Sequence, residues 1–199
     1  IYLSNEQKLT DWLSLKYGVR WSAFQNIGKA TVFNYDDNYE SIDSTVHGSG
    51  VYNTYTAFEP RVGAVFKVSP TASVKANFAH NVQYIQLANN SASGSPLDIW
   101  FSTSPNIKPQ KVNLFSLGYF QNLKDNEYEA SVEVYYKDQK NVIDFAEHAD
   151  LVMNEKLEGE VRTGTGKAAG VEFMIRKNIG RLTGFANYTL SRSERKIPE

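Results

Sequence analysis

Few residues of this chain have the types and spacing that catalysis, metal binding or phosphate binding requires. The stretch GTGKAAG at residues 164–170 suggests a phosphate-binding loop. Such a loop needs four residues between its first glycine and the Gly-Lys pair, followed by Ser or Thr, so that backbone amides hold phosphate and a hydroxyl meets magnesium. Ala168 stands in the hydroxyl position, and the first glycine is misplaced. The stretch therefore predicts a flexible loop that leads into a strand.

The titratable residues do not form a catalytic pattern either. His47, His80 and His148 lie far apart without metal-binding spacing, and no cysteine is present to complete a zinc site. Glu129 and Glu133 fall on one face of a predicted strand, about 13 Å apart at the usual strand rise, which is too far for a glycosidase pair. We interpret them as solvated charges, and the sequence predicts no enzyme and no cofactor.

A short acidic stretch, YDDNYESID at 35–43, offers the hard oxygen ligands that calcium prefers. An EF-hand loop would need Gly where Ser41 stands and Glu where His47 stands. The sequence therefore predicts no metal site here. A loop of solvated acidic residues is the interpretation that we favour over a calcium site. The weak calcium candidates are Asp36, Asp37, Glu40 and Asp43.

Trp100 and Phe101 lie in SGSPLDIWFSTSPN at 93–106, which we expect to belong to a long loop. Large aromatic side chains in a loop either pack locally or bind a ligand, and aromatic faces stack on sugars and other large molecules. The preceding long segment holds tyrosines that would join such a platform, namely Tyr35, Tyr39, Tyr52 and Tyr55. For these six residues, ligand binding and local packing are both consistent with the sequence.

Composition excludes several classes of protein. The 199 residues include 21 basic and 22 acidic side chains, so the formal net charge is −1 and no field of one sign favours nucleic acid. The lack of cysteine removes disulfide frameworks and cysteine nucleophiles. No apolar run reaches the roughly 18 residues of a membrane helix, and no signal peptide is expected at the first residues.

The elements that must position these residues are strands. Even positions from Tyr128 to Tyr136 are apolar, whereas the odd positions between Glu129 and Lys137 are largely polar, and such alternation predicts a strand with one apolar face. Besides a strand end at 1–8, seven segments alternate in this way: 12–24, 61–68, 74–83, 113–123, 128–145, 170–177 and 181–193.

The predicted connections alternate in length. Short turns are expected near 8–11, 69–72, 123–127 and 178–180, and long segments at about 27–56, 85–110 and 147–166, with another after Ser193. This order, together with strands that reach the roughly 9–11 residues of a tilted membrane strand, is typical of an outer-membrane barrel. We predict an all-β chain, an antiparallel up-and-down meander of about seven or eight strands that is part of a large barrel. A soluble sandwich, with the stripe of Leu13, Leu15 and Tyr17 as its core, is the alternative.

Several stretches, in this order, resemble the C-terminal barrel of TonB-dependent outer-membrane receptors, particularly those of Bacteroides-like bacteria. They are YLSNEQKLTDWLSLKYGVRW, FEPRVGAVFKV, NIKPQKVNLFSLGYF, YEASVEVYYKDQKNVIDF, GKAAGVEFMIRK and GRLTGFANYTLSRS. In that family a Pro-Arg pair opens one strand, as Pro60 and Arg61 do here, and a segment like Asn-x-x-Lys-Pro-Glu opens another. Here Gln110 replaces the glutamate after Pro109.

The resemblance implies a fold, a location and partners. Residues 1–199 would be part of a single β-barrel domain in the outer membrane of a Gram-negative cell, with the plug domain and the remaining strands absent. The intact protein would import a siderophore, cobalamin or glycan. Its expected partners are membrane lipid, its own plug, the TonB coupling protein, the nutrient and a surface lipoprotein. A passive channel or adhesin barrel, and a soluble carbohydrate-binding sandwich, are the alternatives.

Overall fold

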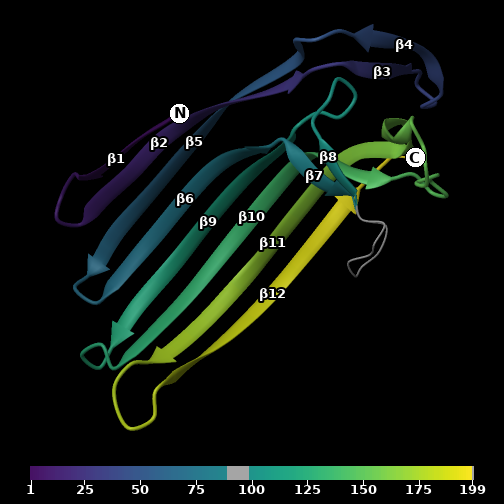
Figure 1. The fold of residues 1–199 in the computed structure, drawn as a ribbon. Helices are drawn as coiled ribbons and strands as arrows, with labels where there is room; N and C mark the ends of the chain where they lie inside the picture. The colour runs from purple at the N-terminus through teal and green to yellow at the C-terminus, as the bar shows by residue number, and fades with distance from the viewer. Residues whose placement is uncertain (89–98, 199) are drawn as a thin grey trace.

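Eight long strands form one antiparallel sheet in this computed structural model, which describes residues 1–88 and 99–198. Each strand pairs with the next long strand along the chain (Figure 1). The predicted all-β meander is therefore confirmed, and a strand occupies the N-terminal residues. The strands are β1 (Tyr2–Lys8), β2 (Leu13–Ile27), β5 (Val51–Ser69), β6 (Ala72–Gln83), β9 (Gln110–Leu123), β10 (Tyr128–Phe145), β11 (Val161–Lys177) and β12 (Gly184–Lys196).

The two ends of the sheet differ. Short turns at 9–12, 70–71, 124–127 and 178–183 gather at one end, and the long connections 28–50, 84–109 and 146–160 gather at the other (Figure 1). The long connections contain the hairpin β3 (Ala30–Tyr35) and β4 (Ser41–His47), the hairpin β7 (Ile85–Ala88) and β8 (Ile99–Ser102), and the 3-10 helix η1 (Leu157–Glu160). The predicted asymmetry of the connections is present.

Several strands are longer than the sequence predicts. The stretch GTGKAAG lies inside β11 and is not a loop, and β12 continues past Ser193 to Lys196, where another long segment was expected. The prediction for GTGKAAG was wrong because its glycines were taken as loop residues, whereas β12 only extends three residues beyond the expected boundary. Glycine within a strand instead marks a close approach by a neighbouring group.

Gly170 shows how a glycine serves this sheet. It lies opposite Tyr135 of β10. A Cβ atom at Gly170 would come within 2.7 Å of the Tyr135 ring, closer than atoms can pack, so the ring occupies the space above the glycine backbone. The cross-strand pair of a tyrosine and a glycine therefore stabilises the position of the aromatic ring, and the local preference of glycine for loops is overridden.

The apolar stripes of β2, β5, β6 and β9 to β12 share one face of the sheet. Val132 lies opposite Tyr119 on one side and opposite Phe173 on the other. This face stays open, since Val132, Val134 and Tyr136 are 40%, 41% and 42% exposed. One row across the whole sheet comprises Gln7, Leu15, Ala64, Ala76, Leu117, Val134, Val171 and Leu190.

Nothing in the described part of the chain packs over this apolar face as a second sheet, so the stripe is not the core of a sandwich within these residues. The buried hydrophobic cluster lies at the end with the long connections. It comprises Ala88, Phe101, Ile107, Ile143, Phe145 and Val161. Among the described residues no helix has the length and apolar character needed to cross a membrane.

Candidate functional site

The opposite face of β1, β2, β5 and β6 is polar and hollowed. A hollow of about 690 Å³ opens on it. Because side chains alternate across a strand, every second residue of these four strands points to the face on which this hollow opens. Its charged lining comprises Glu6, Lys16, Arg20, Glu59 and Arg61. In a closed barrel this face would border the aqueous interior.

Glu59 is the most enclosed charged group of this face, with a side chain that is 0% exposed. Arg20 Nε donates to Glu59 Oε1 at 3.0 Å, and the guanidinium also contacts Oε2. Ser22 Oγ donates to Oε1 at 2.8 Å, and the backbone N–H of Val82 donates to Oε2 at 3.2 Å. The carboxylate is fully engaged, so it joins β2, β5 and β6 and is not free to act as a base.

Residues 103–109 hold the long connections together. Thr103, Ser104 and Ile107 are buried. The Asn26 side chain, at the end of β2, donates to the Thr103 carbonyl at 2.9 Å, and the Asn141 side chain, on β10, donates to the Pro109 carbonyl at 2.8 Å. Residues 103–109 are thus hydrogen-bonded to both β2 and β10.

Asn106 extends the same arrangement to two further elements. Its Nδ2 donates to the Phe33 carbonyl in β3 at 3.0 Å and to Glu158 Oε2 in η1 at 2.7 Å. Since an amide NH₂ has two donors, both are used. One side chain therefore connects the β3–β4 hairpin with the segment between β10 and β11.

The structure brings two of the predicted tyrosines onto these connections. Tyr35 donates its hydroxyl to the Lys156 carbonyl at 3.2 Å, and Tyr55 donates to the Ser104 carbonyl at 3.0 Å. Burial of Tyr35 beside Glu158 raises the pKa of its hydroxyl. These two side chains support the ends of the long connections.

Tyr39 and Tyr52 have different neighbours. The Arg162 guanidinium lies 3.7 Å from the Tyr39 ring centroid, a cation–π arrangement. Tyr52 stacks on His47 with ring centroids 4.8 Å apart. The four tyrosines therefore lie along the same group of connections but do not form one continuous aromatic platform.

Trp100 and Phe101 lie on β8 and not in an irregular loop, and their side chains point in opposite directions. Trp100 is 66% exposed, whereas Phe101 is buried and meets Phe145 edge-on at a centroid distance of 5.8 Å. Phe101 thus packs in the local core and Trp100 offers a free face. Residues 93–98 of the same sequence stretch lie outside the described residues.

The acidic residues at 36–43 hydrogen-bond within their own hairpin. Asp36 Oδ1 accepts the backbone N–H of Asn38 at 2.9 Å and that of Glu40 at 2.8 Å, and Asp43 accepts from the Asn34 side chain. Asp37 is exposed. Within residues 1–88 and 99–198, no three His, Cys, Asp or Glu side chains gather as a metal site would require.

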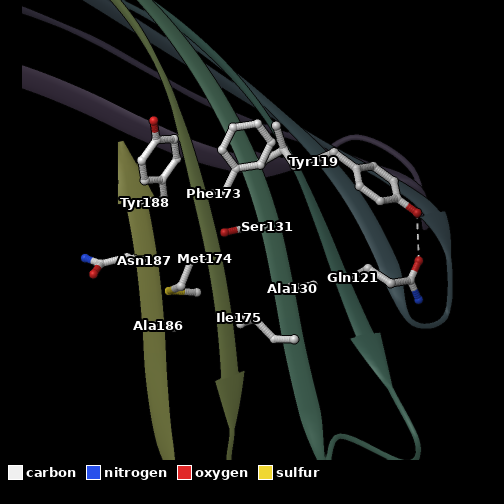
Figure 2. A pocket seen from close by; sticks show the side chains of 11 residues that line it. Tyr119, Gln121, Ala130, Ser131, Phe173, Met174, Ile175, Ala186, Asn187 and Tyr188 are labelled. Carbon is white, nitrogen blue, oxygen red and sulfur yellow. Dashed lines mark hydrogen bonds between the residues drawn. The ribbon is translucent and has the colours of Figure 1, made fainter. Parts of the chain in front are cut away.

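A second hollow, of about 450 Å³, lies on the apolar face near the short turns (Figure 2). Tyr119, Phe173 and Tyr188 border it, and the small side chains of Ala130 and Ala186 leave it open. Because its walls are apolar and it opens on the outward face, it is unsuited to a polar nutrient.

Two parts of this arrangement were not predicted as functional from sequence. Arg20 and Glu59 are ordinary members of alternating strands, and no local signal marks them as a pair. Asn106 had a signal, because it stands in the NIKP segment that resembles a family motif. Its role in joining β3 to η1 depends on Phe33 and Glu158, which are distant from it in sequence.

Comparison with known proteins defines the class. The sequence profile of the family described as TonB dependent receptor-like, beta-barrel, matches residues 1–198, and the chain belongs to this family. Receptors of this family are transporters and not enzymes, and they reside in the outer membrane of Gram-negative bacteria. No curated protein sequence gave a significant match.

Solved structures share the fold. The chain is similar to the ferric-catecholate import receptor Fiu of Escherichia coli K12, with a TM-score of 0.63 and 16% identity over 98% of this chain and 27% of that one. It is also similar to the alcaligin outer-membrane receptor FauA of Bordetella pertussis, with a TM-score of 0.60 and 18% identity over 98% and 29% of the two chains. The RagAB peptide transporter aligns with a TM-score of 0.56 and 14% identity over 99% and 22%. The chain thus spans less than a third of each of these relatives.

Proposed function

We propose that the intact protein containing this chain is an energy-coupled importer of a large nutrient in the outer membrane. Residues 1–199 supply part of a single β-barrel domain, and the plug, the remaining strands and the contact with the TonB coupling protein lie outside them. The nutrient is a siderophore, cobalamin, glycan or peptide, and a surface lipoprotein is a further expected partner. No covalent chemistry is required of these residues.

One observation carries the proposal. The apolar face is continuous across the seven strands β2, β5, β6 and β9 to β12 and is exposed, while the opposite face carries charges and a large hollow. From Tyr128 to Asp138 the strand β10 rises about 33 Å, or about 25 Å along the membrane normal at a tilt near 40°. This height matches the apolar band of an outer-membrane barrel.

Nutrient capture is assigned to the end with the long connections. Trp100, Tyr39 and Tyr52 present aromatic surface there, and Tyr35, Tyr55 and Phe101 support that surface through the contacts described above. Aromatic faces of this kind bind sugars and large organic ligands. The acidic residues Asp36, Asp37, Glu40 and Asp43 remain solvated hairpin charges in this proposal.

The membrane assignment is tested with single cysteines, which the lack of native cysteine in this chain makes straightforward. A polarity-sensitive fluorophore is attached at Leu15, Tyr17, Ser14 or Lys16 of the intact protein in lipid vesicles. We expect hydrocarbon-like emission from Leu15 and Tyr17, and water-like emission from Ser14 and Lys16. Equal emission from both pairs would contradict the barrel wall.

Transport is tested in cells that depend on one nutrient at a time, drawn from ferric siderophores, cobalamin, oligosaccharides and peptides. For the nutrient that supports growth, Trp100→Ala should raise the concentration needed for half-maximal uptake. Trp12→Ala is the matched control, because Trp12 is 54% exposed at the opposite end of the sheet. Uptake that continues without the coupling protein would favour a passive channel instead.

A further inference from the structure

Tyr84 is the last residue before the β7–β8 hairpin, which carries the exposed Trp100. The strands β7 and β8 have four residues each, and they lie at the end of the sheet that carries the long connections (Figure 1). A two-stranded hairpin is at best marginally stable by itself. The position of Trp100 therefore depends on the contacts that hold this hairpin to the rest of the chain.

The backbone carbonyl of Tyr84 closes the base of the hairpin. It accepts the backbone N–H of Thr103 at 2.7 Å and the Thr103 hydroxyl at 2.9 Å. Thr103 directly follows β8 and is 1% exposed. Tyr84 thus holds together the two chain segments that enter and leave the hairpin.

The side chain of Tyr84 contacts the polar face of β2. Its ring stacks on the Phe24 ring, with centroids 5.4 Å apart and an angle of 9° between the planes. Its hydroxyl lies 2.8 Å from Ser22 Oγ. Ser22 and Phe24 are two residues apart and so point to the same face of the strand. The backbone and the side chain of one residue therefore join the hairpin to β2.

The hydrogen bonds from Tyr84 run in one direction, toward Glu59. Ser22 Oγ lies 2.8 Å from Glu59 Oε1, and an ionised carboxylate only accepts, so the single hydroxyl hydrogen of Ser22 is donated there. The Tyr84 hydroxyl must then donate to Ser22 Oγ. Hydrogen bonds arranged in series polarise and strengthen one another. The carboxylate that Arg20 holds therefore also orients the hydroxyl of Tyr84.

Two other side chains hold the base of the hairpin without reaching this pair. Asn26 donates to the Thr103 carbonyl at 2.9 Å, and Tyr55 donates to the Ser104 carbonyl at 3.0 Å. Within the described part of the chain, neither side chain hydrogen-bonds to Ser22 or Glu59. Removing the Tyr55 hydroxyl therefore loosens the same segment but leaves the contacts of Glu59 intact.

We propose that Tyr84 is a positioning residue for nutrient capture, and that its hydroxyl makes the position of Trp100 depend on the pair formed by Arg20 and Glu59. While the pair is intact, Ser22 is oriented to accept the Tyr84 hydroxyl, and the hairpin holds the Trp100 ring in one place. When the pair or the Ser22 hydroxyl is lost, the hairpin opens more often and captures the nutrient less tightly. The effect on capture rests on the proposed function.

Hydrogen exchange of the intact protein in detergent micelles measures how often β7 and β8 open. Ser22→Ala should speed exchange there by about threefold or more, as expected for a lost hydrogen bond, and leave β9 and β10 unchanged. Tyr84→Phe, which keeps the ring on Phe24, should act alike, and Ser22→Ala should add nothing to it. Tyr55→Phe is the matched background, in which Ser22→Ala should keep its full effect.

The pair itself is tested with Arg20→Lys. A lysine cannot reproduce the two contacts that the guanidinium makes with Glu59. This variant should also speed exchange of β7 and β8. The effect should disappear in the Tyr84→Phe background, because the hydroxyl that links the hairpin to the pair is then absent.

Uptake separates positioning from a general loss of stability. For the nutrient that supports growth, Ser22→Ala and Tyr84→Phe should raise the concentration for half-maximal uptake by about twofold or more, because a smaller fraction of hairpins is correctly placed. The maximal rate should not change. Ser14→Ala is the control, since Ser14 lies on the same face of β2 near the short turns, and it should leave both values as they are.

The inference is overturned if Ser22→Ala leaves exchange of β7 and β8 unchanged, if its effect adds to that of Tyr84→Phe, or if exchange rises equally throughout the sheet. Faster exchange with an unchanged half-maximal concentration would refute the role in capture. A protein that supports growth on no nutrient would refute the proposed function, whereas non-additive exchange would still confirm that the hairpin depends on Arg20 and Glu59.

Discussion

Arg20 and Glu59 face each other across β2 and β5, and the guanidinium contacts both oxygens of a carboxylate that water does not reach. The pair lies midway along β2 and β5, beside the end of β6. Because Ser22 and the Val82 N–H also donate to Glu59, the interaction fixes the relative position of β2, β5 and β6.

Replacing Arg20 should be more damaging than replacing its neighbour Arg61. Arg20→Gln leaves the Glu59 carboxylate buried without its counter-charge, which costs about 3 kcal/mol or more. Arg61→Gln is the matched control, since Arg61 is exposed and bonds only to the Asn81 side chain among described groups. Urea unfolding of the intact protein in lipid vesicles measures both, and equal midpoints would contradict a structural role for the pair.

Asn106→Asp should separate the β3–β4 hairpin from η1. The substitution replaces the two amide donors by a carboxylate that repels Glu158 and leaves the Phe33 carbonyl without its donor. Hydrogen exchange of the intact protein should then be faster in both elements and unchanged in β9 and β10. Asn38→Asp adds the same charge at an exposed turn position and should leave exchange in η1 as it is.

Gly170→Ala should lower stability by about 1 kcal/mol or more, because the new methyl group displaces the Tyr135 ring from its position above the glycine. In a Tyr135→Ala background the same substitution should have little effect, so a double-mutant cycle isolates the contact. Gly184→Ala is the control, since a Cβ there meets nothing within 4 Å. Additive effects in the cycle would show that the ring and the glycine do not interact.

High pH should release the β3–β4 hairpin through Tyr35. Its pKa is raised by burial beside Glu158, so the neutral hydroxyl is the form that the docked hairpin favours. The docking contribution is complete below the ordinary tyrosine pKa of about 10 and is lost as pH rises through the higher folded value. The anisotropy of a dye on Asn38→Cys should fall over this range. In a Tyr35→Phe background the dye should show no such transition, and an identical fall there would exclude Tyr35.

Sequence patterns were sufficient to predict the eight-stranded sheet. They were insufficient to predict the contacts among the long connections at its end. Alternation at Val132, Val134 and Tyr136 is a local property, because neighbouring side chains on a strand point to opposite faces whatever lies beside them. The eight long strands and the placement of the connections followed from it. The strand ends did not, because Gly164 and Gly170 look like loop residues until their neighbours on β10 and β12 are known.

The contacts of the candidate site join residues far apart in sequence. Asn106 meets Phe33 and Glu158, and Arg20 meets Glu59. Such pairs depend on the order of strands in the sheet, which no window of neighbouring residues contains. Trp100 and Phe101 illustrate the same limit: both were candidates for binding, but only their positions on β8 separate the exposed ring from the buried one.

The two faces of β10 are separated by a single layer of backbone, and this affects how the protein can evolve. Deleting one residue such as Ser131 would exchange the faces of every side chain beyond it, sending Glu133 to the apolar face and Val134 to the polar face. Substitutions can accumulate along the wall one face at a time, whereas insertions and deletions are tolerated only between strands. We therefore expect natural variation in chain length to concentrate at 28–50, 84–109 and 146–160, while the eight long strands keep their length.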